Sequence, residues 1–377
     1  MSGRQEVRGR LVLDDRVVMG TVVVEADRIA AVEPEGTTEE AGHFIAPGFV
    51  DVHVHGWGGH DAMGPVGALD GMARALLRRG VTSFLPTAYT APWAAIVAFA
   101  ETARGWIPNA PQDGAAPLGF NLEGPFVAPA RKGAHDPVLL RTPAEIGLPA
   151  MESVVEGLRL ITVAPELPGA LELIGWLRDR GIRTSLGHSA ATLDEARAGY
   201  TAGATTTTHL FNAMSGIDHH APGLAVAALT DDEVFVELIA DGHHVDVSLW
   251  PIIVRTKPAD RLMLVSDAIP LAGTRAGRAR IGSLEVEIVD GRVTLAGTTT
   301  LAGSVIALDS AVRQLVGSGV PVPAAVAAAS ANPLAMLGVD DRGRIAVGQR
   351  ADLVELDEGL RVRRVMRAGE WFEAAGG

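Results

Sequence analysis

Two histidines stand two residues apart in an apolar, β-branched stretch near the start of the chain. The stretch reads Gly48-Phe49-Val50-Asp51-Val52-His53-Val54-His55-Gly56. In a β-strand, residues i and i+2 point to the same face, so His53 and His55 can bind one metal ion together. Neutral imidazole is a common ligand of zinc-like ions. The pattern predicts a metal site, although the polar face of an edge strand would produce the same pair.

Further ionisable residues end other strand-like runs of the sequence. The eight runs are 49–55, 81–87, 118–123, 159–164, 183–188, 204–209, 235–240 and 261–267. The residues at their ends are His53, His55, Glu123, His188, His209 and Asp267. A single histidine of this kind is more often a hydrogen-bonded core residue, and one aspartate can simply cap a helix. Six together favour a shared site for one or two divalent metal ions.

Such a set of ligands predicts hydrolytic chemistry. A divalent ion lowers the pKa of a bound water to about 7, so hydroxide becomes available as a nucleophile at neutral pH. Asp267, placed beside the metal and its water, would accept the proton of the water and pass it to a leaving amine. The expected reaction is therefore metal-assisted hydrolysis of an amide or a related bond.

The elements that must position these residues alternate between strands and helices. Eight strand–helix units predict an α/β fold, a (β/α)8 TIM-like barrel over residues 47–342, in which the strand ends converge on one face. A doubly wound open sheet is the competing architecture, but no Gly-x-Gly-x-x-Gly follows the first strand. Residues 1–46 and 343–377 read as short strands and are expected to form one small, discontinuous β-sandwich domain. A turn at Asp290-Gly291 predicts a hairpin insertion near 281–296.

Composition narrows the class of protein. The formal net charge is −13 and no basic run is present, which argues against a nucleic-acid partner. Without cysteine there are no disulfides, and nitrogen and oxygen must hold any metal. Residues 1–10 lack the apolar stretch of a secretory signal, and no segment offers the roughly 18 apolar residues of a membrane span. We therefore expect a cytoplasmic protein without a membrane partner.

Local sequences around the strand ends resemble the amidohydrolase superfamily and, within it, the N-acetylglucosamine-6-phosphate deacetylase family. The most specific runs are Leu-Glu-Gly-Pro-Phe at 122–126 and His-Leu-Phe-Asn-Ala-Met at 209–214. Pro-Gly-Phe-Val-Asp at 47–51, Lys-Gly-Ala-His at 132–135 and Leu-Ala-Gly-Ser at 301–304 support them. The resemblance implies a homodimeric hydrolase that converts N-acetylglucosamine 6-phosphate and water to glucosamine 6-phosphate and acetate.

The resemblance also implies roles for individual residues. Glu123, His188 and His209 would hold the principal ion, zinc first, with iron, cobalt or manganese as alternatives, and His53 and His55 would add a second position. Asp267 would be the catalytic acid and base, and His135 would polarise the acetyl carbonyl. The residues expected to bind the sugar are Ala134, His135, Asn212, Ala213, His220, Asp241, Gly242, His243, His244, Leu301, Ala302 and Gly303.

One stretch departs from the family pattern. The family usually carries His-Arg-Glu-Pro-Gly after the sixth strand, with the arginine reaching the sugar phosphate, often across a subunit interface. Here residues 219–223 read His-His-Ala-Pro-Gly, so His220 takes the arginine position. Arginine is permanently charged and binds phosphate through a two-pronged fork, whereas histidine is mostly neutral at pH 7.

Three interpretations of His220 stay open. It binds phosphate as imidazolium, another cation compensates, or the substrate lacks the 6-phosphate or differs elsewhere on the sugar. The candidate compensating cations are Arg131, Lys132, Arg275 and Arg278. Another amidohydrolase activity is the alternative among enzymes. A non-enzymatic scaffold is disfavoured because all six predicted metal ligands are retained.

Overall fold

Eight parallel strands form a nearly closed barrel in the chain, whose computed structural model describes residues 3–35 and 42–375. Their order around the sheet is β15-β14-β13-β12-β11-β10-β8-β5, with the short β9 (Ala116–Pro117) paired to β8. The strands are β5 (Phe49–Val54), β8 (Val81–Ala88), β10 (Phe120–Glu123), β11 (Leu158–Val163), β12 (Arg183–Leu186), β13 (Thr206–Thr207), β14 (Phe235–Leu238) and β15 (Leu262–Leu264). The predicted barrel is confirmed, and the doubly wound sheet is excluded.

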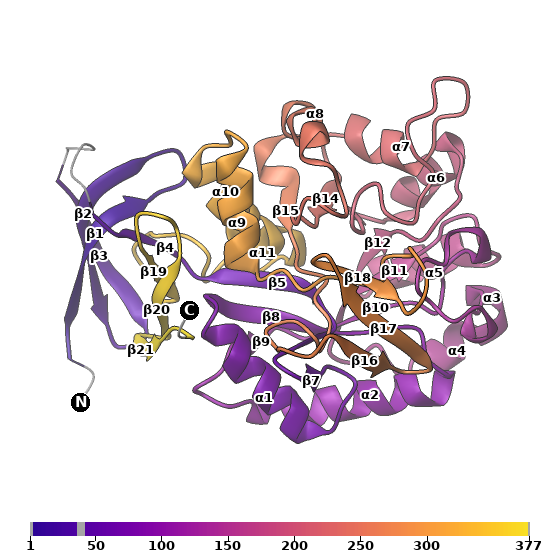
Figure 1. Cartoon of the computed structure of the whole chain (residues 1–377), viewed down its shortest axis with the longest axis horizontal. Coiled ribbons are helices and arrows are strands. Elements are labelled where there is room, and N and C mark those ends of the chain that lie inside the picture. The colour runs from indigo at the N-terminus through magenta and orange to yellow at the C-terminus, as the bar shows by residue number, and fades with distance from the viewer. Residues whose placement is uncertain (1–2, 36–41, 376–377) are drawn as a thin grey trace.

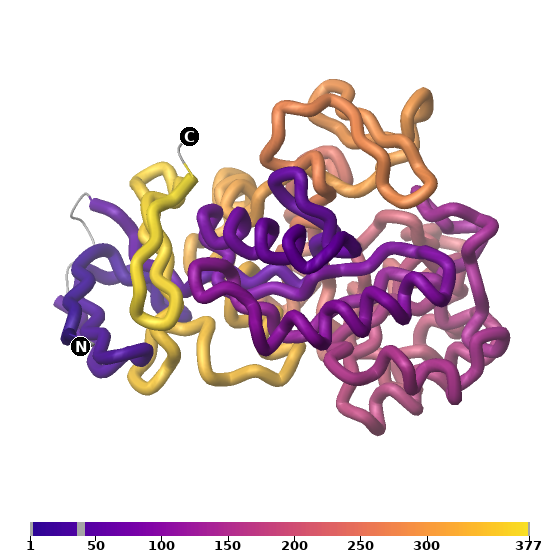
Figure 2. Tube along the Cα trace, turned by 90° about the horizontal axis from the view of Figure 1, so that it is seen from below, coloured from indigo at the N-terminus to yellow at the C-terminus, as the bar shows by residue number. Residues whose placement is uncertain are grey.

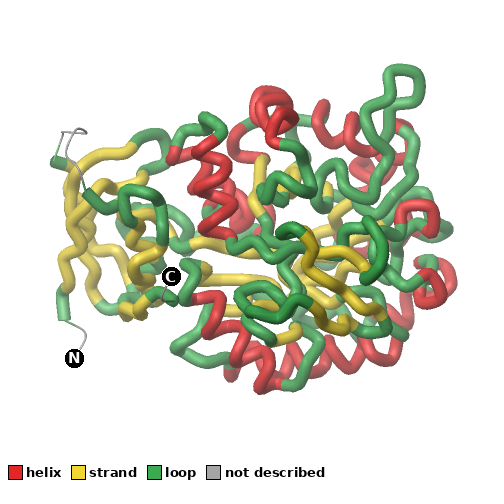
Figure 3. Tube along the Cα trace, in the orientation of Figure 1, coloured by secondary structure: helices red, strands yellow, loops and turns green. Residues whose placement is uncertain are grey.

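Helices surround the barrel (Figures 1 and 3). They are α1 (Val66–Leu77), α2 (Trp93–Trp106), α3 (Pro143–Ile146), α4 (Leu148–Met151), α5 (Ala170–Arg178), α6 (Leu193–Ala202), α7 (Leu224–Thr230), α8 (Trp250–Thr256), α9 (Leu308–Gly317), α10 (Val322–Ala328) and α11 (Ala331–Leu337). Both α9 and α11 contact β5 and β15, the first and last barrel strands. Beyond β15, the Asp267 amide donates to the His53 carbonyl at 2.8 Å, so backbone contact continues between the barrel's two ends.

Strands from both chain ends form a second, seven-stranded sheet beside the barrel (Figure 1, left). In sheet order they are β21 (Glu370–Glu373), β20 (Val362–Arg367), β19 (Leu353–Leu356), β4 (Phe44–Pro47), β1 (Gln5–Val12), β2 (Val17–Glu25) and β3 (Arg28–Pro34). Gly48 alone separates β4 from β5, and a Cβ there would lie 2.3 Å from Thr82 Oγ1, so only glycine fits this junction. The division into domains at 46/47 and 342/343 stays a prediction.

An insertion after the eighth barrel strand forms a small antiparallel sheet. It contains β16 (Arg278–Ile281), β17 (Leu284–Val289) and β18 (Arg292–Leu295) and protrudes from the barrel (Figure 2, upper right, orange). A two-stranded ribbon, β6 (Gly56–Trp57) with β7 (His60–Asp61), directly follows His55. Among the described residues, no helix has the length and apolar character needed to cross a bilayer.

Phe49 should make a large contribution to stability, because its ring is fully buried at the start of β5 and packs against Gly80. We expect Phe49→Ala to lower the free energy of unfolding by about 3–5 kcal/mol, since it leaves a cavity in the barrel core. Chemical denaturation would measure the loss. Val138→Ala is the control, because Val138 is 71% exposed. Equal losses in the two variants would contradict the assigned core position.

Candidate active site

The carboxyl ends of the barrel strands carry the predicted ligands. His53 lies on β5, Glu123 is the last residue of β10, and His188, His209 and Asp267 follow β12, β13 and β15. These last three have positive φ angles of 46°, 29° and 49°, a region that costs of order 1–3 kcal/mol for residues other than glycine. Backbone strain is therefore concentrated where the strand ends meet.

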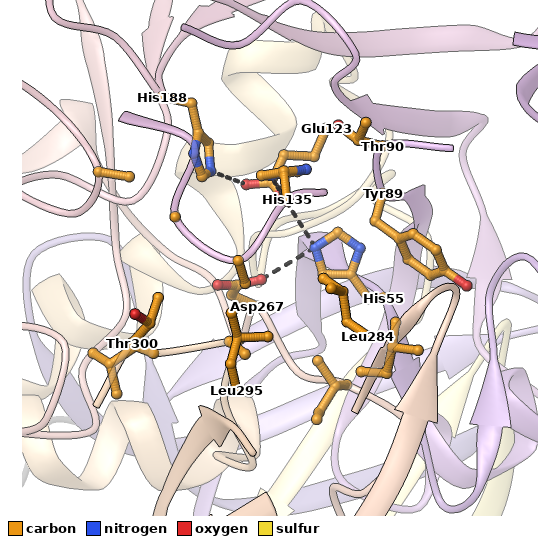
Figure 4. A pocket seen from close by; sticks show the side chains of 18 of the residues that line it. His55, Tyr89, Thr90, Glu123, His135, His188, Asp267, Leu284, Leu295 and Thr300 are labelled. Atoms are coloured by element: carbon orange, nitrogen blue, oxygen red, sulfur yellow. Dashed lines mark hydrogen bonds and ion pairs between the residues drawn. The ribbon is translucent and has the colours of Figure 1, made fainter. Parts of the chain in front are cut away.

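The Glu123 carboxylate lies at the centre of the cluster. Its Oε1 is 3.0 Å from His188 Nε2 and 2.9 Å from His209 Nε2, and its Oε2 is 3.1 Å from His55 Nε2. The same His55 nitrogen lies 3.2 Å from Asp267 Oδ1 (Figure 4). All five residues are buried. Four strand ends thus place their polar atoms around one carboxylate.

This donor set fits a divalent metal ion. His53 Nε2 is buried without a hydrogen-bond partner, although it lies 3.5 Å from Glu123 Oε1 and 3.6 Å from Asp267 Oδ1. One group with mutually close ligand atoms comprises His53, His55, Glu123 and Asp267, and a second comprises Glu123, His135 and His188. Imidazole nitrogen and carboxylate oxygen are the ligands that zinc-like ions accept in the absence of thiolates.

The electrostatics of the cluster agree with a cation site. Burial raises the pKa of Glu123, but the imidazoles of His53 and His188 outweigh it and hold that pKa well below its usual value. Burial and the neighbouring His135 lower the pKa of His188 to about 4, which leaves this imidazole neutral, as a metal ligand must be. Burial lowers the pKa of His55, but hydrogen bonds to two carboxylates have the larger opposite effect and raise that pKa to about 9. The carboxylates therefore require positive charge beside them.

Hydrogen bonds behind the ligands fix the orientation of three rings. His53 Nδ1 donates to Glu237 Oε2 at 3.0 Å, and His55 Nδ1 donates to the Thr87 carbonyl at 3.1 Å. His188 Nδ1 donates to the carbonyl of Arg131 at 3.0 Å. Each bond leaves Nε2 facing the cluster, as supporting groups do at metal sites. Sequence reasoning missed Glu237, although a lone carboxylate in the apolar β14 was a usable signal.

A cavity of about 410 Å³ opens above the cluster. Eight of the residues predicted to bind the sugar line it, and these are Ala134, His135, Asn212, Ala213, His244, Leu301, Ala302 and Gly303. His135 Nε2 lies 3.6 Å from Glu123 Oε2, so it faces the same space as the metal ligands. The structure thus brings most of the predicted site together.

Four predicted residues lie outside this cavity. His220 is exposed in the loop before α7, where its amide donates to Asp218. Asp241 lies behind the lining residue His244 and accepts from its Nδ1 at 2.7 Å. The other two are Gly242 and His243. The direct contact of these four residues with substrate stays a prediction.

Sequence reasoning did not identify a second set of residues that line the cavity. Tyr89 and Thr90 follow β8, and the insertion contributes Ile281, Leu284, Val286 and Leu295. Their types are unremarkable in a β-strand, so only tertiary structure shows that they face the cavity. The predicted insertion is therefore part of the site wall.

A (β/α)8 barrel with buried histidines and carboxylates at its strand ends is the architecture of a metal-dependent hydrolase. The chain belongs to the amidohydrolase family, whose sequence model matches residues 44–372.

Individual relatives are similar over nearly the whole chain. N-acetylgalactosamine-6-phosphate deacetylase of Escherichia coli O157:H7 is 39% identical, covering 91% of this chain and 92% of that protein. Human N-acetylglucosamine-6-phosphate deacetylase is 37% identical, covering 96% and 92%. A solved structure of a mutant N-acetyl-D-glucosamine-6-phosphate deacetylase from Mycobacterium smegmatis, in complex with N-acetyl-D-glucosamine-6-phosphate, is also similar. Its TM-score is 0.90 at 36% identity, covering 98% of this chain and 99% of that chain.

Glu237 should support metal binding without touching the metal. We expect Glu237→Gln to weaken the affinity for a divalent ion by about 10- to 100-fold, because a neutral amide holds the His53 ring less firmly. Competition with a chromophoric chelator would measure the affinity. Glu285→Gln, at an exposed position, is the matched control. The same affinity in both variants would show that the Glu237 charge does not contribute.

Proposed function

We propose that the chain is a metal-dependent deacetylase that hydrolyses N-acetyl-D-glucosamine 6-phosphate to D-glucosamine 6-phosphate and acetate. One observation supports this most strongly: Asp267 and His135 lie with the Glu123-centred ligand cluster at the base of a single cavity. The relatives named above act on the N-acetyl group of hexosamine 6-phosphates, according to their names.

Glu123, His188 and His209 would hold the principal ion, and His53, His55 and Asp267 would provide a second position. Zinc is proposed first, with iron, cobalt or manganese as alternatives. When bound, the ion activates water and polarises the amide carbonyl.

Two side chains would perform the remaining chemistry. The Asp267 carboxylate accepts the proton of the attacking water and later donates it to the departing sugar nitrogen as the C–N bond breaks. The His135 imidazole donates a hydrogen bond to the acetyl oxygen, where negative charge develops. Burial of both groups keeps bulk water away and strengthens these interactions.

The sugar would lie beside His244, which Asp241 orients, and beside Asn212, whose side-chain amide donates to the carbonyls of His209 and Leu210. Among the described residues that line the cavity, Arg131 is the one permanent cation. Arg131 therefore supports recognition of the substrate phosphate by residues of a single chain.

We further propose a cytoplasmic homodimer. Exposed apolar side chains occur in two segments, and these are Ile217 before α7 with Val247, Leu249 and Ile252 in and before α8. A second subunit on this surface would cover them and bring the exposed His220 loop against a neighbouring chain.

A second candidate substrate is N-acetyl-D-galactosamine 6-phosphate. The E. coli relative is named for this sugar and is 39% identical, comparable to the relatives named for the glucosamine epimer. Comparing the two epimers in one assay would separate these candidates.

Removing the metal should abolish deacetylation. We expect exhaustive chelation to eliminate turnover of N-acetylglucosamine 6-phosphate and zinc to restore it, because the cluster alone provides no activated water. Asp267→Asn should lower kcat by about 10²- to 10⁴-fold in the zinc-loaded protein, since it removes the proton acceptor. Acetate release measures both effects. Unaltered turnover after complete removal of bound metal would rule out the mechanism.

Phosphate recognition can be tested through His220. We expect kcat/KM for N-acetylglucosamine 6-phosphate to exceed that for N-acetylglucosamine by about a hundredfold, the effect of one or two charge-assisted hydrogen bonds. His220→Arg should raise the affinity for the phosphorylated sugar, and His219→Arg is the neighbouring control. A ratio near one would show that the natural substrate carries no phosphate at this position.

A further inference from the structure

The cavity is divided into two unlike halves. On one side, a Cβ on Gly133 would lie 3.1 Å from His188 Cε1 and 3.7 Å from Ala213 Cβ, so the loop before His135 packs against the loops that follow β12 and β13. Asn212 and the Arg131 backbone belong to this side. The side chains of His135, His188 and Asn212 offer hydrogen-bonding groups on this side of the cavity.

The other half is formed largely by the insertion, whose cavity-facing side chains are mostly apolar, with the hydroxyl groups of Tyr89 and Thr300 beside them. Ile269, two residues after Asp267, packs in one cluster with Val286, and Ile281 and Leu295 lie against that cluster. Figure 4 shows Leu284 and Leu295 near His55 and Asp267, on the opposite side of the view from His188. We call Ile269, Ile281, Leu284, Val286 and Leu295 the apolar wall; all five line the cavity.

Contacts at both ends hold the insertion in this position. Ser283 Oγ donates to Asp136 Oδ2 at 2.8 Å, which ties the turn between β16 and β17 to the residue after His135. At the other turn, Arg292 Nε donates to His243 Nδ1 at 3.3 Å. These two hydrogen bonds join the insertion that carries the apolar wall to the loops of His135 and His243.

We propose that the apolar wall binds the acyl group of the substrate and accepts chains longer than acetyl, so that N-propionyl and N-butyryl amino sugar phosphates are also substrates. This inference rests on the proposed function. An amide carbonyl at Asp267 has two substituents, and the polyhydroxylated sugar requires the polar half. The acyl chain is then directed to the wall, where the single methyl of acetyl would leave most of five apolar side chains without contact.

The chemistry is unchanged by chain length. Water oxygen bonds to the carbonyl carbon while Asp267 takes one water proton, and the C–N bond breaks as Asp267 passes that proton to the sugar nitrogen. The fatty acid leaves as its carboxylate, and its remaining proton goes to the released amine, which leaves as an ammonium group. Only the contacts of the acyl chain with the apolar wall differ between substrates.

The test compares N-acetyl-, N-propionyl- and N-butyryl-glucosamine 6-phosphate in the zinc-loaded, full-length protein. We expect kcat/KM for the butyryl compound to stay within about tenfold of that for the acetyl compound. Calorimetry with Asp267→Asn, which leaves the ligand intact, should show binding that tightens by up to about fourfold for each added methylene.

A pair of variants in β17 locates the effect. Leu284→Phe fills the space beside the wall and should lower the butyryl-to-acetyl ratio of kcat/KM by more than about tenfold. Val289→Phe is the control: Val289 is 48% exposed and, five residues along the strand, lies on the opposite face, so the ratio should change by less than about twofold.

Two results would overturn the proposal. If the protein hydrolyses the acetyl compound but discriminates against the longer chains by over about a hundredfold, with no gain in binding, deacetylation stands and the acyl site is rejected. If none of the three compounds is hydrolysed, the proposed function fails as well.

Discussion

A single buried carboxylate organises this protein. Glu123 lies among three imidazole nitrogens within about 3 Å, at a depth where an unpaired charge would be strongly destabilising. Positive charge must therefore be held around it, as protonated imidazole or as a metal cation. The ligands come from different strands, so the barrel has to bring several strand ends to one point. The left-handed backbone at His188, His209 and Asp267 is the local cost of this convergence. The packing of the surrounding barrel holds these residues in that strained conformation.

Burial also explains why the support of the ligands is itself charged. Glu237 is fully buried and receives hydrogen bonds from both the His53 ring and the His209 amide, so one carboxylate orients two neighbouring ligand segments. A neutral hydrogen-bond acceptor could orient the His53 ring in the same direction, but it would hold the ring less firmly than a carboxylate does. A carboxylate additionally makes the imidazole a stronger electron donor, which matters for metal affinity.

Local patterns predicted the barrel, which is confirmed, and they predicted a set of ligand candidates that the structure brings into one cluster. Period-two spacing placed His53 and His55 on one face, and ionisable residues at strand ends identified Glu123 and Asp267. The apolar wall could not be found in the same way: Leu284 reads as an ordinary strand residue, and its function depends on where the insertion packs. His220 is the opposite case, because the sequence motif is recognisable but its structural role is not. Its position in a motif is clear from sequence, but the loop that carries it lies outside the cavity of its own chain.

These limits have a common physical origin and bear on specificity. The proposed metal ligands lie at strand ends, where hydrolysis tolerates little displacement of the reacting groups, so local sequence patterns indicate their positions. Substrate selection tolerates more variation, and here it depends on loops and an insertion that contact one another only in the folded protein. Ser283 and Asp136 illustrate this dependence, since one hydrogen bond links the apolar half of the cavity to the loop of His135. A change in the insertion can therefore alter which acyl group is accepted while leaving the Glu123 cluster, and the hydrolytic chemistry it supports, intact.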